Sequence, residues 1–167
     1  IEGTIPGNDK YFTISVTTPL NMQFAVLPNS HQPFGSFFSP EYTIKNNGSK
    51  TIAVKVSGMT RTNNTDPDKA QLFVERKVGG DGKSQIELFL RAIDGKNKKD
   101  IKLYDDITKL TEEEKTLYTL GANEIKKMKF YADTWDLPQY EAGKDEAESN
   151  FTLSLEFSVA TPSTVTP

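Results

Sequence analysis

A period-two alternation of apolar and polar residues constrains this chain most, because it returns in segment after segment. Near the start, Phe12, Ile14 and Val16 alternate with Thr13 and Ser15. Successive side chains of a β-strand point to opposite faces, so this pattern is typical of half-buried strands. It recurs in Met22–Val26, Tyr42–Ile44, Ile52–Val56, Gln71–Lys77, Gln85–Arg91, Met128–Ala132 and Phe151–Val159. The alternation predicts an all-β protein.

Turn residues between these segments suggest how the strands connect. Asn47-Gly48 separates two apolar segments, and this dipeptide readily adopts the positive φ angles of tight hairpin turns. We therefore predict a hairpin over residues 41–57. A second turn is predicted at residues 79–82, where three glycines accompany Asp81.

A single short helix is expected to interrupt the strands. Thr111 and Glu114 have the spacing of a capping box, in which a hydroxyl and a carboxylate satisfy the first free N–H groups. The helix is predicted to continue to about Leu120, with Gly121 as a left-handed stop.

About eight short strands with one helical insertion near residues 111–120 predict a jelly-roll-like β-sandwich. We expect a flexible N-terminal arm over residues 1–9 and a single β-sandwich domain over residues 10–160. Residues 161–167 form a Thr/Pro tail or linker, which is either a spacer or a frayed terminus.

Composition narrows the class of protein. Charged residues make up 26% of the chain and the mean hydropathy is −0.54, which fits a globular domain with a polar surface. The net charge of −3 leaves no basic field for nucleic acid. There is no cysteine, so disulfides, thiol nucleophiles and Cys-ligated metals are excluded. No apolar segment is long enough to span a membrane.

Catalytic motifs are also missing from the sequence. The one histidine, His31, stands in a turn-rich segment where a solvated role is expected. Acidic clusters at Asp66-Pro67-Asp68, Asp105-Asp106 and Asp145-Glu146 could bind calcium, but none has EF-hand spacing. We therefore expect no enzyme activity, no cofactor and no resident metal, while a bound calcium ion stays open.

Aromatic residues near the single tryptophan offer a different possibility. Trp135 stands close to Tyr131 and Tyr140, and exposed rings can stack on sugars. Packing of Trp135 in the core is the simpler interpretation.

Lys10 has the same strand parity as Phe12, Ile14 and Val16. If the strand extends back to Lys10, its amine enters an apolar environment, where burial favours the neutral, nucleophilic form. Such a lysine can form an isopeptide bond with Asn or Asp. If the strand starts at Tyr11, Lys10 lies in solvent.

Two segments carry a resemblance to a known family. Residues 42–52, with Asn46-Asn47-Gly48-Ser49 between two strands, resemble a hairpin of the TasA/camelysin group of biofilm matrix proteins. Residues 150–161 resemble the last strand of that group, which ends in an aromatic residue followed by alanine. The chain is most similar to the BsaA-like clostridial branch of pilin-like fibre subunits.

The resemblance implies a jelly-roll subunit that is exported from a Gram-positive cell and polymerises by N-terminal strand donation. The matching donor strand consists of Lys10, Tyr11, Phe12, Thr13, Ile14, Ser15 and Val16. Fibres of this branch are associated with intermolecular isopeptide links, for which Lys10 is the candidate. Camelysin-type relatives are classed as metallopeptidases, but this sequence lacks a His-rich metal motif.

Two functional hypotheses follow from the sequence. The first is a secreted structural subunit of a biofilm matrix or pilus-like fibre, whose partners are further copies of itself. The alternative is a monomeric cell-surface adhesin or carbohydrate-binding module, with a surface polysaccharide or host ligand as partner.

Overall fold

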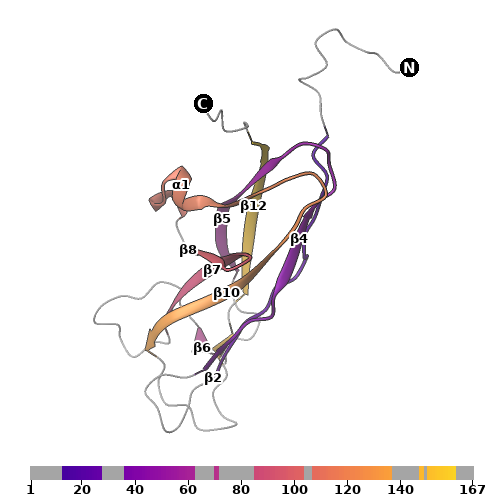
Figure 1. The fold of residues 1–167 in the computed structure, drawn as a ribbon. Coiled ribbons are helices and arrows are strands. Elements are labelled where there is room, and N and C mark those ends of the chain that lie inside the picture. Colours follow the sequence, from indigo (N-terminus) through magenta and orange to yellow (C-terminus); the bar gives the residue numbers. More distant parts are fainter. Residues whose placement is uncertain are drawn as a thin grey trace.

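Two antiparallel sheets packed face to face form the body of the molecule, so the prediction of an all-β sandwich with little helix is confirmed (Figure 1). The computed structural model describes residues 13–27, 36–62, 70–71, 85–103, 107–136, 147–148 and 150–160. The predicted strand over residues 71–77 and the turn over residues 79–82 lie almost entirely outside these ranges.

The larger sheet has five strands, and the smaller sheet has three. In spatial order, the larger contains β1 (Val16–Thr17), β4 (Tyr42–Asn46), β10 (Ile125–Asp136), β7 (Gln85–Asp94) and β8 (Asn97–Lys102). The smaller contains β12 (Asn150–Val159), β5 (Ile52–Thr62) and β9 (Thr116–Leu120). Two short pairs complete the described strands: antiparallel β2 (Ala25–Leu27) with β3 (Ser36–Phe38), and parallel β6 (Ala70–Gln71) with β11 (Ala147–Glu148).

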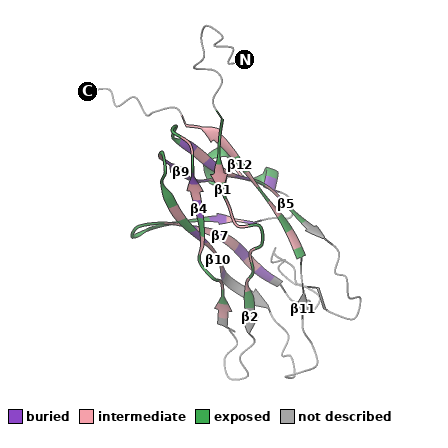
Figure 2. Cartoon of the chain, turned by 90° about the vertical axis from the view of Figure 1, so that its right-hand side faces the viewer, coloured by how far each residue is buried: buried purple, intermediate pink, exposed green. Residues whose placement is uncertain are grey.

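The core lies between the two sheets and is built from the alternating apolar residues. Every second side chain of the central strands is buried, as the period-two pattern predicts (Figure 2). The buried apolar residues of these strands are Ile44 of β4, Ile52, Val54, Val56 and Met59 of β5, Ile86, Leu88, Leu90 and Ala92 of β7, and Met128, Phe130 and Ala132 of β10.

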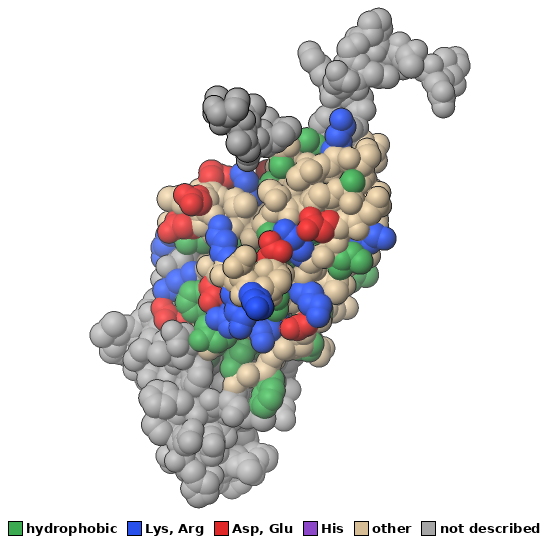
Figure 3. All heavy atoms as spheres, viewed as in Figure 1, with side chains coloured by type: hydrophobic (Ala, Val, Ile, Leu, Met, Phe, Trp, Pro, Cys, Tyr) green, Lys and Arg blue, Asp and Glu red, His purple; other side chains and the backbone are tan. Residues whose placement is uncertain are grey.

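The surface carries charges of both signs. In Figure 3, Lys and Arg side chains lie interspersed with Asp and Glu over the described part of the face in view. Several are paired across neighbouring strands, including Arg91 Nε with Asp100 Oδ1 at 2.7 Å and Lys102 Nζ with Glu87 Oε1 at 2.6 Å. Among the described residues, no helix is long and apolar enough to cross a bilayer.

The predicted hairpin over residues 41–57 is wrong in its pairing, although both strands exist. β4 belongs to the five-stranded sheet and β5 to the three-stranded sheet, so residues 47–51 cross between the sheets. Neither Asn47 nor Gly48 has a positive φ angle. A Cβ atom on Gly48 would lie 3.2 Å from Asn46 Oδ1, a tight contact, so glycine favours the close approach of Asn46 here and does not serve a left-handed turn.

The buried side chain of Asn46 explains why the chain crosses here instead of turning back. Asn46 is 0% exposed, and its Oδ1 accepts a hydrogen bond of 2.9 Å from the backbone N–H of Gly48. Its Nδ2 donates to the carbonyls of Lys50, Leu120 and Gly121 at 2.7, 3.1 and 3.0 Å. Residues 120–125 also cross between the sheets, from β9 to β10. Asn46 therefore joins two crossing segments that are more than 70 residues apart in sequence.

A tight hairpin does occur between β7 and β8, where the sequence analysis placed none. Asp94 pairs with Asn97, and Gly95 between them has a φ angle of 60°. Gly95 and Lys96 are the two turn residues, and a positive φ angle at the first of them is the type II′ pattern. We did not expect this turn because the strand that follows it is highly charged. β8 alternates poorly because four of its six residues, Lys98, Lys99, Asp100 and Lys102, are charged.

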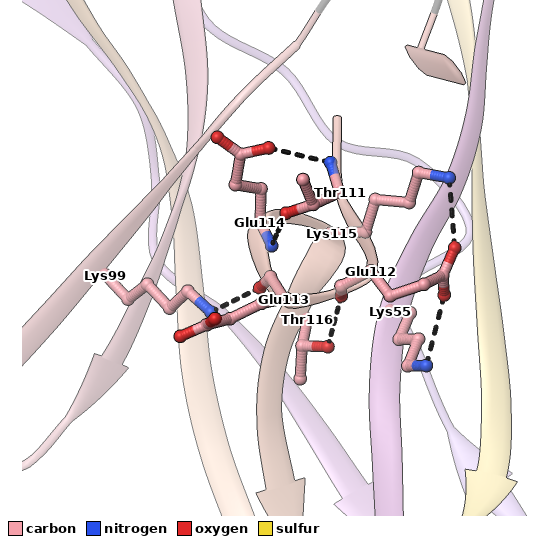
Figure 4. A network of polar contacts seen from close by, with 8 residues as sticks. All are labelled: Lys55, Lys99, Thr111, Glu112, Glu113, Glu114, Lys115 and Thr116. Carbon is pink, nitrogen blue, oxygen red and sulfur yellow. Dashed lines mark hydrogen bonds and ion pairs between the residues drawn. The ribbon is translucent and has the colours of Figure 1, made fainter. Parts of the chain in front are cut away.

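The predicted helix begins where expected and ends early. α1 (Glu112–Lys115) has the full capping box: Glu114 N–H donates to Thr111 Oγ1 at 3.2 Å, and Thr111 N–H donates to Glu114 Oε2 at 2.7 Å (Figure 4). Residues 116–120 form β9 instead of continuing the helix, because pairing with β5 buries Leu117, Tyr118 and Leu120. Gly121 is not left-handed, so the predicted stop is also wrong.

The α1 turn links the two sheets along one side of the sandwich. Lys55 of β5 contacts Glu112 Oε2 at 3.3 Å, and Lys99 Nζ of β8 donates to the Glu113 carbonyl at 2.8 Å (Figure 4). The short helix η2 (Ile107–Lys109) contributes buried Ile107 to the core just before this turn. β8 and β9 also lie in contact here. We call this the closed side.

Candidate functional site

The predicted donor strand is described only over its second half. Lys10, Tyr11 and Phe12 lie outside the described residues, so the isopeptide bond through Lys10 stays a prediction. Thr13, Ile14 and Ser15 precede β1 and belong to no strand, and Val16 is the first residue of β1.

The attachment of this segment to its own sheet is short. Val16 and Thr17 pair with Asn46 and Lys45 of β4. Asn47 adds two hydrogen bonds, from its N–H to the Ser15 carbonyl at 2.8 Å and from Nδ2 to Thr17 Oγ1 at 2.8 Å. Val16 packs partly buried against the core, but Ile14 is 37% exposed. The segment is therefore anchored from Ser15 onward, and about a third of the Ile14 side chain remains in solvent.

The edge of the sandwich on this side is formed by β12. Its strand neighbour is β5, whose other neighbour β9 contacts β7 and β8 on the closed side. β12 therefore lies at the opposite end of its sheet, on the side of β1, and we call this the open side. Figure 2 shows β12 without the fully buried residues that mark β4, β7 and β10.

Five apolar residues of β12 share the face that looks into the sandwich, as predicted. They alternate with exposed residues through most of the strand, but each is only half-buried; they are Phe151, Leu153, Leu155, Phe157 and Val159. Other half-buried apolar residues that pack on the core also lie on β1, around β2 and β3, and at the start of β4. The core is thus less completely covered on the open side.

The aromatic residues proposed as a sugar platform are only partly described. Tyr131 of β10 lies on the outer face of the five-stranded sheet, with its ring centroid 6.1 Å from that of Phe89. The Arg91 guanidinium lies 3.6 Å from the Tyr131 ring centroid. Its hydrogen bond to Asp100 raises the Arg91 pKa, so the cation that covers this ring is permanent. Trp135 pairs through its backbone with Ile86, and Tyr140 lies outside the described residues.

The structure does not describe the candidate titratable sites. His31 and the acidic clusters at residues 66–68, 105–106 and 145–146 lie outside the described residues. Within the described ranges, no group of three or more His, Cys, Asp or Glu side chains is arranged to hold a metal.

One buried polar atom has no hydrogen-bond partner in the described structure, and it lies on the closed side. The Tyr118 hydroxyl is buried between the sheets, and desolvation followed by the nearby Asp94 charge raises its pKa. Lys126 lies close by, with Nζ 5.6 Å from the Tyr118 ring centroid, 3.0 Å from Asp94 Oδ2 and 2.9 Å from the Thr119 carbonyl. This cluster joins β7, β9 and β10 and is a structural tie.

The feature that sequence reasoning missed is the position of β12 at a sheet edge. The strand itself was predicted, and its composition held a further signal. Residues 150–159 contain no lysine and no proline, the residues with which proteins commonly protect an exposed edge. Comparison with known proteins adds no assignment, because no family model, curated protein or solved structure matches this chain.

Proposed function

We propose that this chain is a structural subunit of an extracellular fibre of the biofilm-matrix or pilus-like kind. Subunits would assemble head-to-tail by donating an N-terminal strand to the next copy. The observation that carries the proposal is the incomplete burial of Ile14. An apolar side chain within an alternating segment is left 37% exposed and outside any strand of its own subunit.

The physical reason for assembly is the burial of this apolar alternation. Phe12 and Ile14 have the parity of one strand face, with Thr13 on the other. Full burial of an exposed side chain of this size contributes about 1.5–3 kcal/mol, and Ile14, at 37% exposed, would add roughly a third of that. Donation between copies is a heterologous contact, which does not close on itself and so extends into a filament.

A covalent link through Lys10 would add to this assembly. The neutral Lys10 amine would attack the side-chain carbonyl of an Asn in the neighbouring copy, forming an amide and releasing one ammonia. With Asp as acceptor, one water would leave instead. Either reaction balances without an external oxidant or cofactor.

The alternative, a monomeric carbohydrate-binding module, finds less support. Its described aromatic residue, Tyr131, has Arg91 over its ring. The rest of its predicted platform rests on Trp135 and Tyr140. We therefore favour the fibre subunit, and we propose that the chain has no catalytic role.

The experiment compares the full chain with two aspartate variants. Concentrated wild-type protein should form filaments under electron microscopy and oligomers by light scattering. Ile14→Asp should remain monomeric, because a charge cannot enter the buried row of a neighbouring sheet. Leu20→Asp is the matched control: Leu20 is 96% exposed and lies after β1, so this variant should assemble like wild type.

Two results would contradict the proposal. A wild-type chain that stays monomeric at high concentration would remove the fibre function. An Ile14→Asp variant that assembles normally would remove the donor segment. The Lys10→Ala variant tests the covalent link separately, since it should lose SDS-resistant ladders and keep the filaments.

A further inference from the structure

The long edge of β12 is the feature of the molecule that most resembles an unfilled strand site. β12 pairs with β5 from Asn150↔Thr62 to Val159↔Ile52, which uses one of its two edges along the whole strand. On the other edge, none of the described strands pairs with it. An edge strand presents a row of backbone N–H and C=O groups to any extended segment that reaches it.

The other end of the five-stranded sheet shows how this protein protects an edge. β8 ends that sheet and carries Lys98, Lys99 and Lys102, with α1 beside it. β12 has a single charged residue, Glu156, which lies between Ser154 and Ser158 on the outer face of the strand. Two edges of the same fold therefore differ in their protection, and the longer one has no partner among the described strands.

The inward row of β12 also lacks full cover. Leu153, Leu155 and Phe157 are half-buried, whereas Val54 and Val56 of the adjacent strand β5 are 0% exposed. A strand added beyond β12 would place its own apolar side chains next to this row and complete its burial. The required occupant is an extended segment with apolar residues at every second position.

The N-terminal segment has that pattern and is not taken up by its own sheets where it is described. Its polar residue Thr13 would share the outer face with exposed Thr152 and Ser154 of β12. Ser15, Val16 and Thr17 stay attached to β4 and Asn47, so the donated part would consist of residues before Ser15. Five extended residues span about 17 Å, which is roughly half the length of a ten-residue strand such as β12.

We propose that the outer edge of β12 is the acceptor site for residues 10–14 of a second copy. The inference rests on the proposed fibre function and adds the surface at which one subunit joins the next. It also shortens the predicted donor strand, because Val16 remains in β1 of the donating subunit.

Single cysteines test this contact in the full chain, which has no cysteine of its own. Purified Thr13→Cys is mixed with purified Ser154→Cys at a concentration that gives filaments, and the mixture is oxidised. A disulfide-linked heterodimer is expected on a non-reducing gel, since both positions lie on the outer face. Lys98→Cys on β8 is the matched control, an exposed cysteine on the opposite edge, and should give no heterodimer with Thr13→Cys.

Each result separates this inference from the function on which it rests. One outcome is that filaments form, but Thr13→Cys links to Lys98→Cys of β8 or to neither partner. That outcome would overturn the acceptor site and leave the fibre function intact. Absence of filaments would overturn both. A double variant with Thr13→Cys and Ser154→Cys, oxidised when dilute, covers the remaining case. If the double variant forms the disulfide within single chains as readily as the mixture forms it between two chains, the N-terminal segment pairs with β12 of its own chain. The inference is then wrong.

Discussion

The two sides of the sandwich differ in how they close the core. On the closed side, α1 holds β8 and β5 together through Lys99 and Lys55, and η2 places Ile107 in the core. On the open side, β1 has two residues and β12 has no described neighbour beyond its outer edge. The closed side completes its core within the chain, whereas the open side ends in half-buried apolar residues.

This difference arises although the strands on the two sides have the same kind of sequence. Val54 and Val56 of β5 alternate with Ala53 and Lys55, much as Leu153 and Leu155 of β12 alternate with Ser154. The β5 residues are fully buried because strands flank β5 on both edges. Burial of an alternating strand thus depends on its place in the sheet as much as on its hydrophobicity.

The largest expected effect comes from truncating one leucine on each side. Leu103, which follows β8, is 0% exposed, so Leu103→Ala should lower the free energy of unfolding by about 3 kcal/mol. Leu155→Ala on β12 should cost about 1 kcal/mol in the monomer, because part of that side chain already contacts solvent. Urea denaturation of dilute protein measures the free energy of unfolding of both variants. Equal losses in the two variants would show that the two sides bury their leucines equally well.

Asn46 tests whether the crossing segments depend on one buried side chain. Asn46→Ala removes the amide that bonds three carbonyls and the Gly48 N–H, and should cost about 3 kcal/mol. Asn47→Ala is the control, since exposed Asn47 loses only its side-chain bond to Thr17 and should cost about 0.5 kcal/mol. Similar urea midpoints for the two variants would show that the crossings are held by packing alone.

Tyr118 tests whether every buried polar group on the closed side has a hydrogen-bond partner. Its buried hydroxyl has no partner among the described residues, so Tyr118→Phe should raise the free energy of unfolding by about 1 kcal/mol. Because burial raises the Tyr118 pKa, this phenol should not ionise in a spectrophotometric titration before the protein unfolds. A lower melting temperature in the Phe variant would indicate a hydrogen bond that the folded state needs.

The smallest expected effect concerns the cap of α1. Thr111→Ala removes the hydroxyl that accepts from Glu114 N–H and should cost about 0.5 kcal/mol by thermal unfolding. The backbone hydrogen bond from Thr111 holds the pKa of Glu114 below its usual 4.5. The ionised cap therefore contributes fully above pH 4.5 and is lost as pH falls through the lower folded value. A Glu114→Gln variant should differ from wild type at neutral pH and converge with it in acid.

Much of the fold was predictable from local pattern. The strand segments at residues 52–56, 85–91, 128–132 and 151–159 were placed correctly, because alternation is written in neighbouring residues. The capping box was also found, since it needs only Thr111 and Glu114. β8 was missed because its exposed edge position calls for charge instead of alternation.

Pairing was the part that the sequence did not reveal. Asn47-Gly48 suggested a hairpin, yet Asn46 bonds to Leu120 and Gly121, which are distant in sequence, and directs β4 and β5 into different sheets. Helix propensity after Glu114 yielded to β9 because pairing with β5 buried three side chains at once. The candidate donor segment is visible as a pattern, whereas the edge of β12 that we propose as acceptor has no local signature except the absence of lysine and proline.

The sequence by itself thus determined that this protein is an all-β sandwich with alternating strands and the capped start of one helix, because those properties depend on nearest neighbours. Only the tertiary structure decided which strands lie inside, which strand stands at the open edge, and where the chain crosses between sheets. Those properties depend on contacts between residues far apart in the chain, and Asn46 and β12 acquire their roles only when the two sheets have packed.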